Sequence, residues 1–147
     1  MNDNLVVVGE RVEKKVRFSP EEIMNFARMT FDENPLHSDR KAAQRAHFGE
    51  IIAAGQHTSA LMMGLAATHF SRGDDGIARE MLCLNFNFAF KLPVFAGQAM
   101  SLEWKVTSAV WNSKLDGVLA HIDGQAAASP DEPAVIGRGT ILVKPAG

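Results

Sequence analysis

Residues 55–70 read GQHTSALMMGLAATHF, and this stretch decides the fold. It contains no Asp, Glu, Lys or Arg. Its apolar residues, among them Leu61, Met62, Leu65 and Phe70, occur nearly all the way round a helix of this sequence. A helix on the surface of a globular protein would instead show a polar face opposite its apolar one. We therefore expect a central helix that the rest of the chain encloses on most sides.

Other segments of the chain have the two-residue period of β-strands. Four of them follow the helix: Leu82–Phe90, Met100–Val106, Leu115–Ala127 and Val135–Lys144. In the first, large apolar residues occupy every second position without a break, which predicts one continuous apolar face. Before the helix, either Val6–Val8 or Arg11–Phe18 adds another strand. An antiparallel sheet wrapped around one long central helix accounts for all of these segments, and it makes the chain an α+β protein.

A shorter helix is expected near the start of the chain. Ser19-Pro20-Glu21-Glu22 supplies an N-cap serine, a proline in the first turn and a capping-box glutamate. Pro35 disfavours helical geometry at the residue before it, so this helix should end near Asp32 or Glu33. A further helical turn is expected at Arg40–Ala46.

The polar run DENPLHSD at residues 32–39 is the first candidate for a chemical site. Asp32 and His37 are separated by a turn that contains proline, so a carboxylate and an imidazole can converge on one point. Together they could hold a water molecule, with the carboxylate taking its proton and the imidazole orienting it or returning a proton. In the alternative, structural reading, Asp32 and Asn34 only cap turns and His37 is a loop residue.

The start of the central helix, Ile51-Ile52-Ala53-Ala54-Gly55, is the second candidate. The first amides of a helix lack partners within the helix and form its positive end. Glycine lets a ligand oxygen approach the backbone closely, and a carbonyl bound there would be polarised. Alternatively, Gly55 marks only a tight turn. His57 and His69 lie on the same helix, and we expect each to be a hydrogen-bonded core histidine.

Composition and charge exclude several classes of protein. A chain of 147 residues is the size of a single domain. It has 15 Lys and Arg against 17 Asp and Glu, a net charge of −2, so it lacks the basic excess of a nucleic-acid binder. It also lacks a polybasic membrane-binding segment and an apolar run long enough to span a membrane, and we expect no signal peptide. The single cysteine, Cys83, excludes an internal disulfide and a zinc cluster, so we expect a cytoplasmic protein.

Three stretches of this sequence resemble the MaoC-like dehydratases, a family with the hotdog fold that includes the (R)-specific enoyl-CoA hydratases. Phe31–Asp39 is similar to the hydratase motif of that family, in which an Asp and a His form the catalytic pair. Ile51–Gly55 is similar to the start of its central helix, and Phe90–Gly97 to a strand end and turn. The resemblance covers almost all of residues 1–147, which are identified as a single MaoC-like hotdog domain.

The resemblance implies a function and a set of site residues. Asp32 and His37 would activate water for syn addition across the double bond of a 2-enoyl-CoA, or catalyse the reverse dehydration of a 3-hydroxyacyl-CoA. The amide of Gly55 would bind the thioester oxygen. The substrate-binding residues would be Asn34, Ala54, Gln56, His57 and Met63. The CoA thioester is the substrate, and neither a metal nor a redox cofactor is expected.

Two positions depart from the family pattern. Many hydratases of the family have a histidine immediately before the glycine, where this chain has Ala54, and a serine eight residues after it, where this chain has Met63. Gln56, His57 and Thr58 could supply polarity instead. Two alternatives therefore stay open, an acyl-CoA thioesterase of the hotdog type and a non-catalytic thioester-binding protein. Hotdog thioesterases of one large group place a carboxylate on the central helix, and this chain has none there.

The resemblance also implies partners. Hotdog sheets usually pair edge to edge, so we expect a homodimer or a higher homo-oligomer. The CoA would lie in a groove near that interface, and its phosphates require basic residues. Candidates for this role are Arg40, Lys41, Arg45, Arg72 and Lys91. We expect no nucleic-acid or membrane partner.

Overall fold

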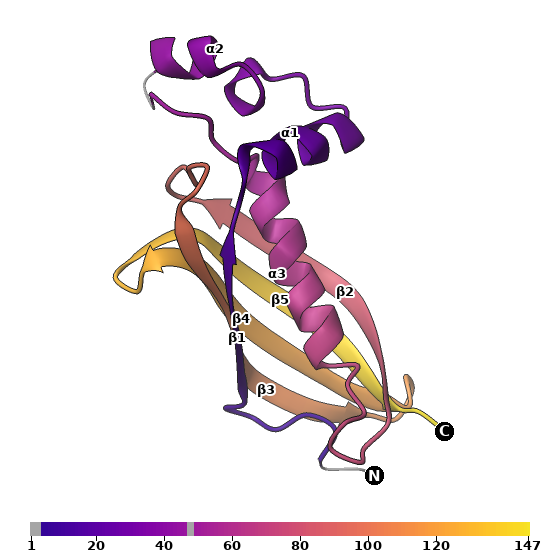
Figure 1. Cartoon of the computed structure of the whole chain (residues 1–147). Helices are drawn as coiled ribbons and strands as arrows, with labels where there is room; N and C mark the ends of the chain where they lie inside the picture. Colours follow the sequence, from indigo (N-terminus) through magenta and orange to yellow (C-terminus); the bar gives the residue numbers. More distant parts are fainter. Residues whose placement is uncertain (1–3, 47–48) are drawn as a thin grey trace.

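The computed structural model describes residues 4–46 and 49–147, which form one antiparallel sheet and a set of helices (Figure 1). The strands are β1 (Arg11–Arg17), β2 (Arg79–Phe90), β3 (Ala99–Asn112), β4 (Gly117–Ser129) and β5 (Glu132–Pro145). The helices are α1 (Pro20–Met29), the short 3₁₀ helix η1 (Pro35–His37), α2 (Arg40–Arg45) and α3 (Gly55–His69). The order of strands in the sheet is β1-β3-β4-β5-β2, and the sheet curls around α3. The predicted α+β architecture is confirmed, with β1 as the N-terminal strand in place of Val6–Val8.

The core lies between α3 and the concave face of the sheet. Met62 of α3 is fully buried, and Trp104 of β3 donates a hydrogen bond from Nε1 to its carbonyl at 2.6 Å. Aromatic rings fill the space beneath the helix by packing against glycines of the sheet. A side chain at Gly124 would meet the ring of Trp104, and one at Gly139 would meet the ring of Phe86. These strand glycines therefore make room for the rings that support α3.

The opposite face of α3 is less covered than the sequence predicts. Leu61 is 37% exposed, and Ala60, Gly64 and Thr68 on the same side are exposed as well. These residues border a groove beside Val16 of β1. The expectation that the helix is enclosed on most sides is wrong for this face, because the sheet covers one side of α3 and β1 reaches only its edge. In the described part of the chain, no helix is long and apolar enough to cross a membrane.

The apolar pattern of β2 does not lie on one face of the sheet. The pairing of β2 with β5 changes register between Cys83 and Asn85, which is the signature of a β-bulge. Met81 packs against the core before this change, and Phe86 and Phe88 pack against it afterwards. Two leucines that the alternation places on the apolar face are instead exposed: Leu82 and Leu84. The prediction of one continuous apolar face is wrong because the bulge changes which face of the sheet the side chains after it point to.

Helix α1 begins at the predicted capping box. Ser19 Oγ accepts a hydrogen bond from the amide of Glu22, and the Glu22 carboxylate accepts one from the amide of Ser19. The helix ends at Met29, earlier than expected, because Phe31 adopts a positive φ of 59°. The Asp32 amide then donates back to a carbonyl in the last turn at 2.8 Å, as at many helix C-termini. Asp32 therefore lies just outside the helix.

Helices α1, η1 and α2 together form the N-terminal helical segment (residues 20–45). Figure 1 shows this segment at the N-terminal end of α3. It is joined to the chain leading into α3 by the amide of Ile52, which donates to the carbonyl of Leu36 at 3.2 Å. The residues of the DENPLHSD motif are thereby placed beside the start of the central helix.

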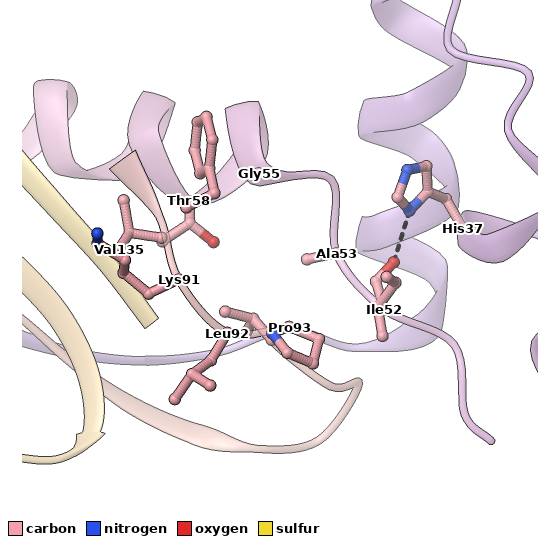
Figure 2. A pocket seen from close by; sticks show the side chains of 11 residues that line it. His37, Ile52, Ala53, Gly55, Thr58, Lys91, Leu92, Pro93 and Val135 are labelled. Carbon is pink, nitrogen blue, oxygen red and sulfur yellow. Dashed lines mark hydrogen bonds between the residues drawn. The ribbon is translucent and has the colours of Figure 1, made fainter. Parts of the chain in front are cut away.

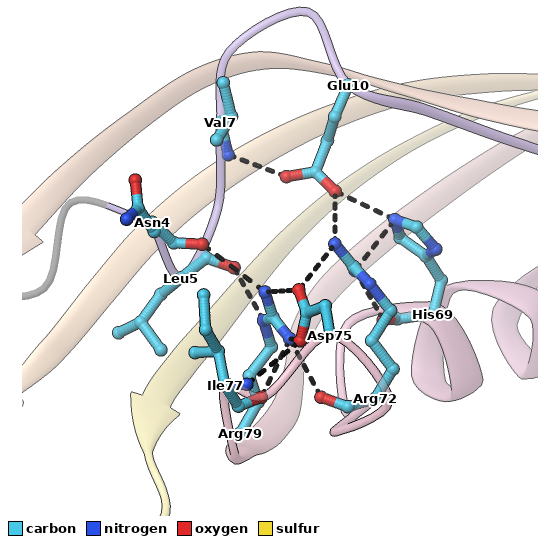
Figure 3. A network of polar contacts seen from close by, with 9 residues as sticks. All are labelled: Asn4, Leu5, Val7, Glu10, His69, Arg72, Asp75, Ile77 and Arg79. Carbon is cyan, nitrogen blue, oxygen red and sulfur yellow. Dashed lines mark hydrogen bonds and ion pairs between the residues drawn. The ribbon is translucent and has the colours of Figure 1, made fainter.

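A polar network at the other end of α3 is centred on Arg79, whose side chain is 1% exposed (Figure 3). Its Nε donates to the carbonyl of Leu5 at 2.9 Å, and its two other nitrogens donate to the carboxylate of Asp75 at 2.9 and 2.8 Å. Further carbonyl acceptors of Arg79 belong to Asn4, Arg72 and Ile77. The hydrogen bond from Arg79 holds the pKa of Asp75 well below its usual range. His69 lies 2.8 Å from Glu10 in the same network, which confirms it as a hydrogen-bonded histidine.

Candidate active site

Asp32 and His37 lie beside each other between α1 and the start of α3. The Nε2 atom of His37 is 3.4 Å from Oδ2 of Asp32. Their side chains are 7% and 22% exposed, so both groups are largely shielded from bulk water. Helix η1 forms the turn between them, and Pro35 occupies its first position. The local structure thus brings together the carboxylate and the imidazole that the sequence singles out.

The second ring nitrogen of His37 fixes the orientation of the imidazole. Nδ1 donates a hydrogen bond to the carbonyl of Ile52 at 2.7 Å (Figure 2). A carbonyl can only accept, so the Nδ1 atom carries the proton, and in the neutral ring Nε2 is an acceptor. Nε2 and the Asp32 carboxylate then form two acceptors that one water molecule can satisfy, donating one hydrogen to each. This arrangement suits the activation of a water molecule.

Asn34 holds the turn that carries this pair. Its side-chain Oδ1 accepts a hydrogen bond from the backbone amide of Leu36 at 3.1 Å, and its backbone amide donates to Oδ1 of Asp32 at 3.0 Å. One oxygen of Asp32 is therefore used in the turn, and the other faces His37. Asn34 is exposed and acts as a turn cap, so the predicted capping role is observed, and it is compatible with a chemical role for Asp32 and His37.

A cavity of about 330 Å³ opens next to His37, between the start of α3 and the end of β2. Its walls include Gly55 and Thr58 of α3, Phe90 of β2 and Val135 of β5, as Figure 2 shows for most of them. Most of the lining is apolar, and its polar side chains are those of His37, Thr58 and Lys91. A concave, mainly apolar site with a few placed polar groups is typical of a binding site for a small molecule.

Gly55 is the first residue of α3 and faces this cavity. The N-cap residue is Ala54, whose methyl group makes no capping hydrogen bond to the first amides. A Cβ atom at position 55 would lie 2.7 Å from the ring of Phe90, so the glycine leaves room for that ring. The positive end of a helix with an uncapped first turn can bind an oxygen that carries negative charge.

The other predicted binding residues lie elsewhere. Gln56 is exposed and donates from Nε2 to Oγ1 of Thr30 at 3.3 Å. His57 is buried and stacks on Phe26 with ring centroids 4.2 Å apart, and its burial lowers its pKa. The expectation that it is a hydrogen-bonded core histidine is wrong at Nδ1, which has no partner among the described residues because aromatic rings pack around it. Met63 is half-buried on α3. None of the three lines the cavity next to His37.

Two features of the site were not singled out from the sequence. The carbonyl of Ile52 is the partner that orients His37, and no sequence signal identifies a backbone acceptor of this kind. Thr58 lines the cavity, although the sequence suggested it only as a possible source of polarity. Its position three residues after Gly55, on the same side of a helix, is a signal that could have identified it. Within residues 4–46 and 49–147, no group of three or more His, Cys, Asp or Glu is placed to hold a metal ion.

Comparison with known proteins gives the family. Residues 6–117 match the family model described as the MaoC like domain. The chain belongs to this family. We therefore compare the arrangement of Asp32, His37 and Gly55 with the sites of MaoC-like hydratases and dehydratases.

Two curated relatives carry related activities in their names. The (R)-specific enoyl-CoA hydratase of Aeromonas caviae is 31% identical over 108 residues, which cover 74% of this chain and 76% of that protein. The mitochondrial 3-hydroxyacyl-[acyl-carrier-protein] dehydratase FERN of Solanum lycopersicum is 27% identical over 107 residues. That match covers 73% of this chain and 60% of the tomato protein, so the MaoC-like chain spans less than two thirds of that relative.

Solved structures confirm the hotdog fold. The (R)-hydratase of A. caviae superimposes with a TM-score of 0.77 at 28% identity, covering 96% of this chain and 98% of its own. An R-hydratase of Pseudomonas aeruginosa in the unliganded form superimposes with a TM-score of 0.81 at 22% identity, covering 96% of this chain and 84% of its own. The MaoC-like chain thus has the five-stranded sheet and central helix of its family.

Proposed function

We propose that this protein adds water to a 2-enoyl-CoA, or removes it from the corresponding 3-hydroxyacyl-CoA. The observation that carries the proposal is the pairing of Asp32 and His37, with the imidazole anchored on Ile52, beside the uncapped start of α3. The family membership and the hydratase and dehydratase relatives support the same reaction.

The proposed mechanism assigns one task to each group. A water molecule held between Asp32 and His37 gives a proton to the carboxylate as its oxygen bonds to the β-carbon of the enoyl group. The electron pair of the double bond moves towards the thioester, whose oxygen gains negative charge. The amide of Gly55 donates a hydrogen bond to that oxygen. Asp32 then passes this proton to the α-carbon on the same face of the double bond, which restores the carboxylate, so one water molecule is added in total.

Replacement of the pair tests this mechanism. Asp32→Asn keeps the shape of the side chain but removes the base, and His37→Ala removes its partner. Each should lower the rate of hydration of crotonyl-CoA at least about a hundredfold, the scale of positioned acid–base catalysis. The rate is followed as the loss of absorbance of the conjugated thioester. Glu33→Gln changes the neighbouring exposed carboxylate and should leave the rate unchanged. Near-normal rates in folded Asp32→Asn and His37→Ala variants would rule out the mechanism.

The same assay separates the two alternatives. A hotdog thioesterase would release free CoA thiol from the substrate, and a non-catalytic binding protein would leave both the double bond and the thioester intact. Helix α3 carries no carboxylate, which disfavours those hotdog thioesterases that use an acid there. A thiol release that exceeds the loss of the alkene would therefore replace our proposal with hydrolysis.

The acyl-CoA, the oligomer and the cellular location belong to this proposal as well. Lys91 lies at the rim of the cavity and is exposed, which suits a contact with a CoA phosphate. Arg72 is already engaged with Glu10 and Asp75, which makes it a poorer candidate for that contact. We propose a homodimer, in which the CoA groove lies near the interface, and a cytoplasmic location in keeping with the single cysteine.

A further inference from the structure

Thr58 combines complete burial with a hydroxyl group that lacks a partner. The residue is 0% exposed and lines the cavity that also contains Gly55 and His37. Among the described residues, its Oγ1 atom has no hydrogen-bond partner. Figure 2 shows the hydroxyl directed into the cavity. The hydroxyl is enclosed at the wall of this cavity, so a ligand that fills the cavity is the group that could supply its missing partner.

Two neighbouring hydroxyl groups, those of Ser59 and Thr30, behave differently. A serine or threonine in a helix often donates to a carbonyl three or four residues earlier. Ser59, the next residue along α3, donates to the carbonyl of Gln56 at 3.0 Å, and Thr30 at the end of α1 donates to Phe26 at 2.9 Å. Thr58 makes no such bond. Burying a hydroxyl without a partner opposes folding, so the free protein is less stable with this group than with an apolar one of equal size.

His57 offers a useful contrast. Its Nδ1 atom is also buried and unpartnered among the described residues. However, its ring packs against Phe18 and Phe26, with centroid distances of 4.4 and 4.2 Å, and it does not line the cavity. The unpartnered atom of His57 therefore does not face a place where a ligand could bind, whereas the hydroxyl of Thr58 does.

The position of Thr58 on α3 identifies the ligand group that it would meet. It follows Gly55 by three residues, so the two lie on the same side of the helix. Helical side chains lean towards the N-terminus and cover the preceding turn. The hydroxyl of Thr58 therefore extends towards the turn that presents the amide of Gly55. Two donors on adjacent turns, facing one cavity, can bind the same oxygen.

We propose that the hydroxyl of Thr58 is a second hydrogen-bond donor to the thioester oxygen that the amide of Gly55 receives. This inference rests on the proposed function, because that function supplies a thioester at the site. The oxygen becomes negatively charged as water adds to the double bond, and a donor already directed at it stabilises that charge. Thr58 would replace part of the polarity that the family pattern places at the positions of Ala54 and Met63.

Binding of two unreactive ligands tests the assignment. Butyryl-CoA carries the thioester oxygen, and S-butyl-CoA is the thioether that lacks only this oxygen. Thr58→Val keeps the shape and removes the donor. It should weaken the binding of butyryl-CoA about threefold to tenfold, as expected for one neutral hydrogen bond, and leave the affinity for S-butyl-CoA unchanged. Both affinities are measured by calorimetry. Thr58→Ser should retain the affinity of the original protein. Thr68→Val, the same change on the exposed face of α3, is the matched control.

Three results would overturn the assignment: equal weakening of both ligands by Thr58→Val, no weakening of butyryl-CoA, or a failure of the original protein to bind either ligand. Thr58→Val should also melt at a temperature equal to or above that of the original protein, since it removes an unpartnered buried hydroxyl. If Thr58→Val does not fold, Thr58→Ala carries the same comparison. Binding that depends on Thr58 without any hydration of crotonyl-CoA would contradict the proposed function and leave this assignment standing.

Discussion

His57 shows how a single buried ring can make stability depend on pH. Burial is the main cause that lowers its pKa, and the neighbouring His37 adds to the effect while Glu22 opposes it. The imidazole stacks on Phe26 and is 7% exposed, so a charge there would lose most of its hydration. The unfolded chain therefore binds a proton at this residue at a higher pH than the folded chain does.

The sign of the resulting pH dependence follows from this difference. As the pH falls below about 6.5, the ordinary value for histidine, the unfolded state takes up the proton first and the free energy of unfolding decreases. The uptake of one proton changes the free energy of unfolding by at most about 1.4 kcal/mol per pH unit. His57→Leu should remove this part, so its free energy of unfolding in urea should fall less between pH 7.5 and 5.5 than that of the original protein. Equal decreases in the two proteins would show that His57 is not the responsible group.

Single residues also show what the sequence could and could not predict about the site. Asp32 and His37 were predictable because their separation is short and Pro35 restricts the turn between them. The roles of His57 and Thr58 depend on how α3 is rotated against the sheet, which follows from packing and not from local sequence. The carbonyl of Ile52 is a backbone group, so its pairing with His37 could be found only in the folded chain.

At the level of elements, the start of β2 is stabilised by its first residue, Arg79, whose guanidinium forms hydrogen bonds from all three nitrogens. Arg79 donates to several carbonyls and to Asp75. Removing it would leave the buried carbonyl of Leu5 without this donor and the exposed carboxylate of Asp75 without its counter-charge. Arg79→Met should therefore lower the free energy of unfolding by about 1–3 kcal/mol, the cost of a buried acceptor left without a partner, as measured in urea. Arg79→Lys keeps the charge but not the planar group and should lower it less. Arg138→Met is the control, because its side chain is 81% exposed and should contribute little. A folded Arg79→Met protein with unchanged stability would contradict this account.

Strand β2 also marks the limit of prediction at the level of elements. The order of helices and strands could be predicted because hydrophobic period and capping residues are local signals. The bulge between Cys83 and Asn85 leaves no local signal, since the alternation of apolar residues continues through it. The early end of α1 was missed for a related reason, because Phe31 is not a residue that normally adopts a positive φ.

At the scale of the whole molecule, the two outer strands of the described sheet differ in character. Strand β1 exposes charged residues along most of its length, including Lys14 and Lys15. Strand β2 exposes Leu82, Leu84 and Phe90, which are 57%, 48% and 57% exposed. Charged edge strands resist pairing with another chain, whereas long apolar ones favour it. We therefore place the proposed homodimer interface at β2.

A lysine on this edge tests the interface. Leu84→Lys should shift the protein from dimer to monomer at micromolar concentration, as measured by light scattering after size-exclusion chromatography. Its far-ultraviolet circular dichroism should stay unchanged, because the leucine is exposed. Leu115→Lys makes the same change in the turn between β3 and β4 and should remain dimeric. A monomeric original protein would contradict the homodimer, and a dimeric Leu84→Lys protein would move the interface away from β2.

The N-terminal helical segment carries both Asp32 and His37, whereas the Gly55 amide belongs to α3. The polar contacts that join the segment to the start of α3 are the bonds of Ile52 to Leu36 and to His37 and the bond of Gln56 to Thr30, and Phe26 stacks on His57. Local opening of such a segment requires less free energy than unfolding of the whole sheet. It follows that the protein can lose its activity while its sheet is still intact. If the proposed function holds, the heat tolerance of hydration depends on this contact area, and a more stable β-sheet would not by itself make the activity more heat-resistant.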